Sequence, residues 1–312
     1  MIGSSVSASR ERVGVGDVAA AAQLACLLEA SAPKPGNVSP GRHFEDLRYE
    51  DFLASAAAIG GPLSGAGDRP LGLTIRLAID ATARWTRSNS NLGVVLLLAP
   101  LAKAASDVEA GAASIVPSGF RRSLRSALRH VLDATTIDDA REAYAAIRRA
   151  APGGLGTVED QDIAGEPTRT LVDVMRMAAA RDAIAREYAT AFETTFDIGA
   201  PSLERARLDG LSWDDAVVEA FLTLLGGAPD THIARRGGAA LAARVTDRAR
   251  EALAAGGVRS AEGRAAIADI DRELRDSRHL ANPGATADLT AAALFVALLG
   301  GAWDGGRHAA SR

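Results

Sequence analysis

Helical periodicity extends along almost the whole of this sequence, and it constrains the fold more than any single motif does. Apolar residues recur at helical spacing, and no segment shows the strict alternation of a half-buried β-strand. Ala and Leu, the best helix formers, are abundant. The pattern predicts helices near residues 17–30, 49–59, 69–85, 91–106, 117–132, 138–150, 168–194, 212–225, 236–254, 260–277 and 285–299. The expected fold class is all-α, a bundle of about ten or more helices.

The chain of 312 residues is long enough for one large domain or two small ones. Its longest segment without periodicity, residues 151–170, has the composition of a linker or of a loop. The helix predicted after it, residues 168–194, is apolar along one stripe and needs partners from the rest of the fold. We therefore expect a single domain over residues 1–312, with residues 1–15 flexible.

Composition excludes several classes of function. The net charge is −4 and the pI is near 5.8, whereas a nucleic-acid surface needs clustered Lys and Arg. The longest apolar runs fall short of the ~20 residues of a membrane span. The lone Cys26 allows no intramolecular disulfide, which fits a reducing cytoplasm. We expect a cytoplasmic protein with small-molecule partners, without nucleic-acid or membrane partners, and the sequence leaves the oligomeric state open.

The stretch "EASAPKPGNVSPGRHFEDLRYEDF", residues 29–52, connects two predicted helices. Such connections usually take about 2–8 residues in a compact bundle. Its prolines stiffen the backbone, and Gly36 permits close approach to a ligand. Its polar residues suit phosphate or cation binding, and they are Glu29, Lys34, Arg42, His43 and Asp46. The alternative is a solvated loop with ordinary ion pairs.

Three further segments carry polar groups at the predicted helix ends. Ser90 and Asn91 precede a buried helix, where they cap it or form an anion or ribose site. Arg235 and Arg236 stand beside two glycines and resemble a phosphate clamp, close to Asp230 in "PDTHIARRGG". Asp288 interrupts the apolar run "NPGATADLTAAALF". It is either a helix-dipole partner in a first turn, or a metal ligand or base that lines a cavity.

No single motif identifies an enzyme class. The sequence holds no "GxxxxGK[ST]" phosphate loop and no "GxSxG" hydrolase elbow. If phosphates are bound, they must be held by scattered Lys and Arg, by helix N-termini and by carboxylate-bound Mg²⁺.

Taken in order, these segments resemble the triphosphoribosyl-dephospho-CoA synthase family. The matching pieces are "APKPGNVSPGRHFEDL", "SNSNLG", "PGGLG", "RDAIAREY", "DTHIARRGG" and "NPGATADLTAAALF". The resemblance implies an all-α transferase that moves a triphosphoribosyl group from ATP to 3′-dephospho-CoA and releases adenine. The product is the precursor of the prosthetic group of a lyase acyl carrier. Lyase-linked members read closer to "TPKPGLVD", so this chain resembles a divergent branch.

That resemblance leaves the acceptor and the roles of the residues open. A related transfer to a methanopterin-type precursor and a non-catalytic nucleotide-binding protein are the alternatives. In the expected site, Mg²⁺ is held by carboxylates among Glu29, Asp46, Asp230 and Asp288. The nucleotide contacts Lys34, Gly36, Arg42, Ser90, Asn91, Arg235 and Arg236. The catalytic groups are His43, Asp46 and Asp288, one of which is the general base.

Overall fold

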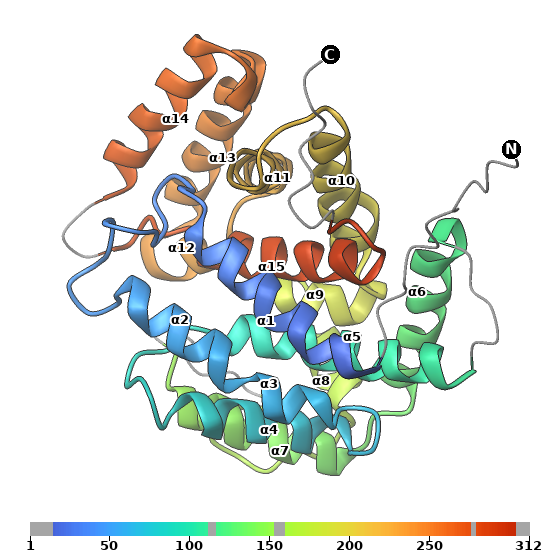
Figure 1. Ribbon diagram of the computed structural model, residues 1–312. Coiled ribbons are helices and arrows are strands. Elements are labelled where there is room, and N and C mark those ends of the chain that lie inside the picture. The colour runs from blue at the N-terminus through green and yellow to red at the C-terminus, as the bar shows by residue number, and fades with distance from the viewer. Residues whose placement is uncertain (1–14, 112–116, 153–159, 276–278, 304–312) are drawn as a thin grey trace, which may run out of the picture.

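The computed structural model describes residues 15–111, 117–152, 160–275 and 279–303. These residues form helices and loops without a β-strand, and they make one all-α domain (Figure 1). The fold class expected from periodicity is therefore confirmed. The expectation of flexibility at residues 1–15 concerns residues outside the described ranges, apart from Val15, where α1 begins.

The central helix is α15 (Gly284–Leu299), and almost all of its residues are buried. A helix that is apolar on every side is stable only when other elements surround it. It packs against α1 (Val15–Ser31), α5 (Leu92–Gly111), α11 (Trp213–Gly227) and neighbouring helices. Figure 1 shows α1 and α5 lying beside α15 in the middle of the molecule.

Helices from the two halves of the chain cover this centre on opposite sides (Figure 1). On one side lie α2 (Tyr49–Ala58), α3 (Gly60–Ser64), α4 (Leu71–Thr82) and α7 (Ile137–Ala150). On the other lie α10 (Ala200–Leu208), α11, α12 (Thr231–Gly237), α13 (Ala239–Ala254), the 3₁₀ turn η2 (Gly257–Arg259) and α14 (Ala261–Leu274). The helix α6 (Pro117–Asp133) packs against α5. Among the described residues, no helix is long and apolar enough to cross a membrane.

The segment predicted as one helix over residues 168–194 is divided into three pieces. They are α8 (Leu171–Ala178), α9 (Ala183–Thr190) and the π-helix η1 (Thr194–Gly199). Asp182 causes the first break, because its side chain caps α9 by accepting from the Ala185 amide. Ala191 and Phe192 cause the second, because both adopt a left-handed backbone conformation with φ of 51° and 59°.

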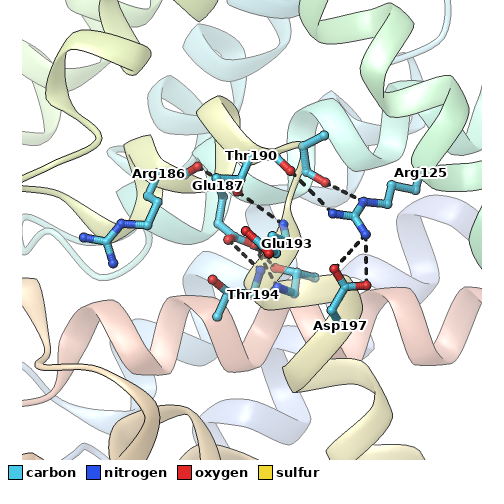
Figure 2. Close-up of polar contacts among 9 residues, drawn as sticks. Arg125, Arg186, Glu187, Thr190, Glu193, Thr194 and Asp197 are labelled. Carbon is cyan, nitrogen blue, oxygen red and sulfur yellow. Dashed lines mark hydrogen bonds and ion pairs between the residues drawn. The ribbon is translucent and has the colours of Figure 1, made fainter.

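Polar contacts, some of them buried, hold this second break in place (Figure 2). Glu187, fully buried, accepts hydrogen bonds from the Thr194 amide at 3.1 Å and the Thr195 amide at 2.9 Å. Arg125 of α6 pairs with Asp197 at 2.8 Å and donates to carbonyl oxygens at the end of α9. The left-handed turn is thus stabilised by the nearby Glu187 and by Arg125, which is distant in sequence.

Candidate functional site

A cavity of about 680 Å³ lies where the N-terminal ends of α5, α9, α12 and α15 meet. Residues from the first or second turn of each helix line it, and they include Gly93, Ile184, Thr231 and Ala285. The first N–H groups of a helix have no partner within the helix, and each helix N-terminus carries roughly half a positive charge. Four such ends around one space favour an anionic ligand.

Two buried or half-buried aspartates cap three of these four helices. Asp182 caps α9. Asp230 accepts from the Ile233 amide of α12 at 2.9 Å and from the Thr286 amide of α15 at 2.7 Å. Burial raises the pKa of Asp230, and these hydrogen bonds oppose the rise. Both oxygens of Asp230 are engaged, so the structure gives this residue a capping role where the sequence suggested a metal ligand.

Asp288 differs from these caps, because it lies at the fifth residue of α15, beyond the first turn. The helix dipole acts mainly on charges in the first turn, so it does not explain a carboxylate at this position. Asp288 lines the cavity and lies against Gly93 of α5: a Cβ on Gly93 would come 2.1 Å from Asp288 Oδ2. Only glycine at position 93 allows the carboxylate this place.

The surroundings of Asp288 favour a proton or a cation. Burial raises its pKa well above the usual range, and the negative charges of Glu29, Asp230 and Asp182 raise it further. Arg235 acts in the opposite direction. A carboxylate with a raised pKa suits a general base, and an excess of negative charge suits a metal ion.

Three arginines line the same cavity. Arg235 pairs with Asp182 at 3.3 Å. Arg186 donates through Nε to the Ala179 carbonyl at 3.3 Å, and Arg181 has an exposed side chain. Arginine binds phosphate oxygens through a fork of N–H donors. Arg236, the other half of the expected clamp, is not among the residues that line this cavity.

Part of the cavity lining is apolar. It is formed by Leu171, Val174 and Met175 of α8 and by Tyr144 and Ile147 of α7. Ligand sites commonly combine such a surface with a few polar groups that fix orientation. The cavity thus has a charged region and a region suited to a planar base or an alkyl chain.

His232 is a cavity residue to which the sequence assigned no role. It lies in the first turn of α12, and its Nε2 is buried without a hydrogen-bond partner among the described residues. Burial lowers its pKa to about 4, with help from the nearby Arg235 and Arg236. The pattern "PDTHIA" could have indicated a helix start, but nothing in it indicates that this imidazole is buried.

Lys34 is not where a phosphate ligand would be. Its side chain is fully buried, pairs with Glu29 at 3.0 Å and donates to the Glu29 and Ala32 carbonyl oxygens. Burial lowers the pKa of Lys34 and raises that of Glu29, and the ion pair opposes both shifts. The Lys34 ammonium group is buried in this pair, which does not agree with the expected role of Lys34 in phosphate binding, whereas the expected role of Glu29 as a metal ligand stays a prediction.

Gly36 and Arg42 also serve the loop itself. The Gly36 amide donates to Asp271 at 2.9 Å, and Arg42 pairs with the same carboxylate at 2.8 Å. Gly36 has φ of +71°, and the Leu274 side chain fills the place of a Cβ. The glycine is therefore explained by its turn and by close packing on α14 rather than by approach to a phosphate.

His43 and Asp46, the other two expected catalytic residues, lie on the exposed surface of this loop. The Asp46 side chain is 82% exposed, 3.9 Å from His279, and neither residue lines the cavity. The structure therefore does not bring them together with Asp288.

Ser90 and Asn91 are buried beside the start of α5. Ser90 shares a hydrogen bond with Ser55 at 2.5 Å, and Asn91 donates to Thr82 at 3.0 Å. These contacts attach the segment to α2 and α4, and they give both side chains a packing role rather than contact with a ribose. The neighbouring Asn89 does line the cavity, and its side chain accepts from the Leu92 amide.

A magnesium site made wholly of protein ligands is not visible. Within the described ranges, no group of three or more His, Cys, Asp or Glu side chains is placed to hold a metal ion. Mg²⁺ is, however, usually held by one or two carboxylates together with water and substrate phosphates. Asp288 fits that requirement, because it faces the cavity and lies in a field of surplus negative charge.

Comparison with known proteins gives concordant results. A family sequence profile described as ATP:dephospho-CoA triphosphoribosyl transferase matches residues 16–306. Relatives bearing the name 2-(5″-triphosphoribosyl)-3′-dephosphocoenzyme-A synthase come from Pseudomonas aeruginosa and Klebsiella pneumoniae. The first is 38% identical over 34% of this chain and 37% of its own length. The second is 38% identical over 31% and 34%. The chain thus aligns with about a third of the length of these relatives.

A solved structure extends the likeness over more of the chain. A crystal structure from Archaeoglobus fulgidus, named for triphosphoribosyl-dephospho-CoA synthase, is similar with a TM-score of 0.60. It is 29% identical and covers 80% of this chain and 98% of its own.

Proposed function

We propose that this chain, which belongs to the ATP:dephospho-CoA triphosphoribosyl transferase family, transfers a triphosphoribosyl group from ATP to a hydroxyl acceptor. The reaction takes place in the cavity described above. In the proposed reaction the bond from ribose C1′ to adenine breaks, an acceptor oxygen bonds to C1′, and adenine leaves. The family name favours 3′-dephospho-CoA as the acceptor. ATP and this acceptor would place the reaction in the cytoplasm.

The observation that carries the proposal is the convergence of four helix N-termini and three arginines on one cavity. A triphosphate carries about four negative charges, and helix ends and guanidinium groups are the partners that such a ligand requires. Among the described residues no other Lys or Arg lines this cavity, and Lys34 is buried in its pair with Glu29. Arg181, Arg186 and Arg235 hold the phosphates in this proposal.

Asp288 is the catalytic carboxylate of the proposal. It takes the proton that the acceptor hydroxyl loses, which its raised pKa suits. Asp288 would also be the carboxylate that holds a Mg²⁺ ion, which would neutralise part of the triphosphate charge. The apolar wall formed by Leu171 and Val174 receives the uncharged part of a substrate.

The test is incubation of the protein with ATP, Mg²⁺ and acceptor, with adenine measured by chromatography and the product by mass. Dephospho-CoA is expected to release adenine and to yield an adduct larger by one triphosphoribosyl group. Binding of ATP should weaken when a chelator removes the metal. The bacterial relatives align over only about a third of their length, so the family name alone does not fix the acceptor. The second acceptor in the test is a ribitol-bearing pterin precursor. Binding of ATP without adenine release from either acceptor would indicate a nucleotide-binding protein without catalysis.

A further inference from the structure

A second cavity adjoins the candidate site, and the proposed reaction has given it no part so far. Its volume is about 340 Å³, and it lies between the ends of α4 and α7 and the start of α5. Asn89 lines both this cavity and the larger one. The end of α7 also reaches both, with Ile147 at the larger cavity and Arg149 at the second. The two cavities are therefore neighbours.

Two arginines of the second cavity are accessible and unpaired. Arg87 follows α4, Arg149 lies in the last turn of α7, and both side chains are exposed. Within the described ranges, neither guanidinium group makes an ion pair or a hydrogen bond. Arg125, which lines a different cavity beside α6, is instead paired with Asp197. A ligand can therefore reach Arg87 and Arg149 without displacing a carboxylate.

The electrostatic balance of the second cavity favours an anion. The helices α4 and α7 end at it, and each helix C-terminus carries roughly half a negative charge, whereas α5 begins beside it with the opposite sign. Two guanidinium groups outweigh these helix ends, and no Asp or Glu is among the described residues of the lining. An arginine near a helix C-terminus still has five N–H donors to share, and such a fork binds phosphate oxygens.

Uncharged donors complete the lining. The Asn89 side chain accepts from the Leu92 amide at 3.2 Å, which fixes its orientation and leaves its side-chain nitrogen without a partner in the described part of the chain. The Thr86 hydroxyl accepts from the Ser88 amide at 3.1 Å and retains its own proton for donation. These groups can donate to the same anion as the two arginines.

The acceptor of the proposed reaction needs such a place beside the larger cavity. Its hydroxyl must reach Asp288, which lies against Gly93 in the first turn of α5. In 3′-dephospho-CoA a diphosphate joins the adenosine ribose to the pantetheine arm, so the ribose hydroxyls are a few bonds from the diphosphate. Asn89, which lies just before α5, separates the two cavities. An acceptor with its ribose in the larger cavity therefore has its diphosphate close to the second one.

We infer that the second cavity binds the diphosphate of the acceptor, with Arg87 and Arg149 as the groups that hold it. The inference rests on the proposed function, because it takes 3′-dephospho-CoA as the acceptor. It divides the phosphates of the two substrates between two sets of arginines. The three arginines of the larger cavity hold the triphosphate of ATP, and the two of the second cavity hold the diphosphate.

Chemical modification of arginine tests this site without catalysis. Phenylglyoxal reacts with accessible guanidinium groups, and mass spectrometry of peptides measures the extent of reaction at each arginine. We expect 3′-dephospho-CoA alone to protect Arg87 and Arg149, and ATP with Mg²⁺ to leave both reactive. Arg84, exposed and outside the lining, is the internal control. Equal protection by ATP would overturn the inference, because the second cavity would then belong to the ATP site.

Variants of the two arginines supply a second readout. Arg87→Gln and Arg149→Gln should each weaken the binding of 3′-dephospho-CoA about 3- to 10-fold in isothermal titration calorimetry, with ATP binding unchanged. Both variants should fold as the parent does, because neither guanidinium group has a partner in the described structure. Arg84→Gln is the matched control and should leave both affinities unchanged. If the double variant Arg87→Gln/Arg149→Gln binds 3′-dephospho-CoA as tightly as the parent, the inference is wrong.

The two proposals fail in different ways. If 3′-dephospho-CoA supports adenine release but leaves Arg87 and Arg149 reactive, the second cavity is not its site and the proposed function stands. If it protects both arginines and no adenine is released, the inference stands and the proposed function fails. If 3′-dephospho-CoA does not bind, both are wrong.

Discussion

Replacing Lys34 by Met tests the roles that sequence and structure assign differently to the proline-rich loop. If Lys34 were a phosphate ligand, replacing it should leave the stability of the fold unchanged. In the structure its ammonium group is fully buried and pairs with Glu29 at 3.0 Å, and Glu29 is only 4% exposed. Met fills nearly the same volume but leaves the Glu29 carboxylate without its countercharge.

The magnitude follows from that burial. Removing one member of a buried ion pair typically costs about 3–5 kcal/mol, because the remaining charge is not compensated. Unfolding entropy is about 2.1 cal/mol/K per residue. A chain of 312 residues should therefore melt about 5–8 °C below the parent after this change.

Differential scanning calorimetry of the parent, Lys34→Met and the double variant Glu29→Gln/Lys34→Met checks this. The double variant removes both charges and should recover most of the loss. A parent-like melting temperature for Lys34→Met, combined with lost ATP binding, would refute the reasoning and restore the phosphate-ligand interpretation.

Three other predictions concern the cavity and the α9–η1 junction. Gly93→Ala should displace Asp288 and reduce turnover about 100-fold. The control Gly227→Ala should leave turnover unchanged, because no atom lies within 4 Å of its new Cβ. Equal turnover of the two variants would contradict the close approach of Asp288 to Gly93. Folding raises the pKa of Asp288, so the free energy of unfolding of the parent is favoured at low pH and falls as the pH rises through the folded pKa. Asp288→Asn has no such titration, and its stability relative to the parent should therefore increase with pH. Parallel thermal-shift curves against pH would exclude that shift. Glu187→Gln should lose about 1–3 kcal/mol in urea unfolding, because an amide group replaces a carboxylate oxygen that accepts from buried donors; the exposed Glu193→Gln is its control, and an equally small effect of both would show that the junction does not depend on Glu187.

The helices were predictable wherever periodicity alone determines them. The predicted range 285–299 differs from α15 by one residue, and 49–59 from α2 by one. Errors arose where a side chain or a backbone angle interrupts the pattern. The range 168–194 was predicted as one helix because the break at Ala191 comes from a left-handed backbone held by Arg125 and Glu187. The helix α10 was missed because Gly199 and Pro201 suggest a loop, although proline is compatible with a first helical turn.

The site was predictable only in part, because sequence shows which groups are polar but not which partners they find. Asp288 and Arg235, two of the expected site residues, line the cavity, and their roles stay predictions. Lys34 is among the residues expected to contact phosphate, yet the nearby Glu29 neutralises its charge inside the fold. His232 and its orphaned nitrogen depend on burial by several helices, which no local pattern encodes.

The loop that contains Gly36 and Asn37 also bears on how the chain folds. Gly36 bonds to Asp271 across 235 residues, and Asn37 donates to Asn282 across 245. Contacts this distant in sequence form only after large loops have closed, so they belong to the slow part of folding. Among the described helices, α15 is the last to be synthesised. Until it is complete, the apolar faces of α1 and α5 that pack against it are exposed to solvent. Such exposed surfaces are where incomplete chains associate. The cavity is therefore incomplete until α15 has docked, because Ala285 and Asp288 of this helix line it, and the proposed nucleotide binding would require that docking.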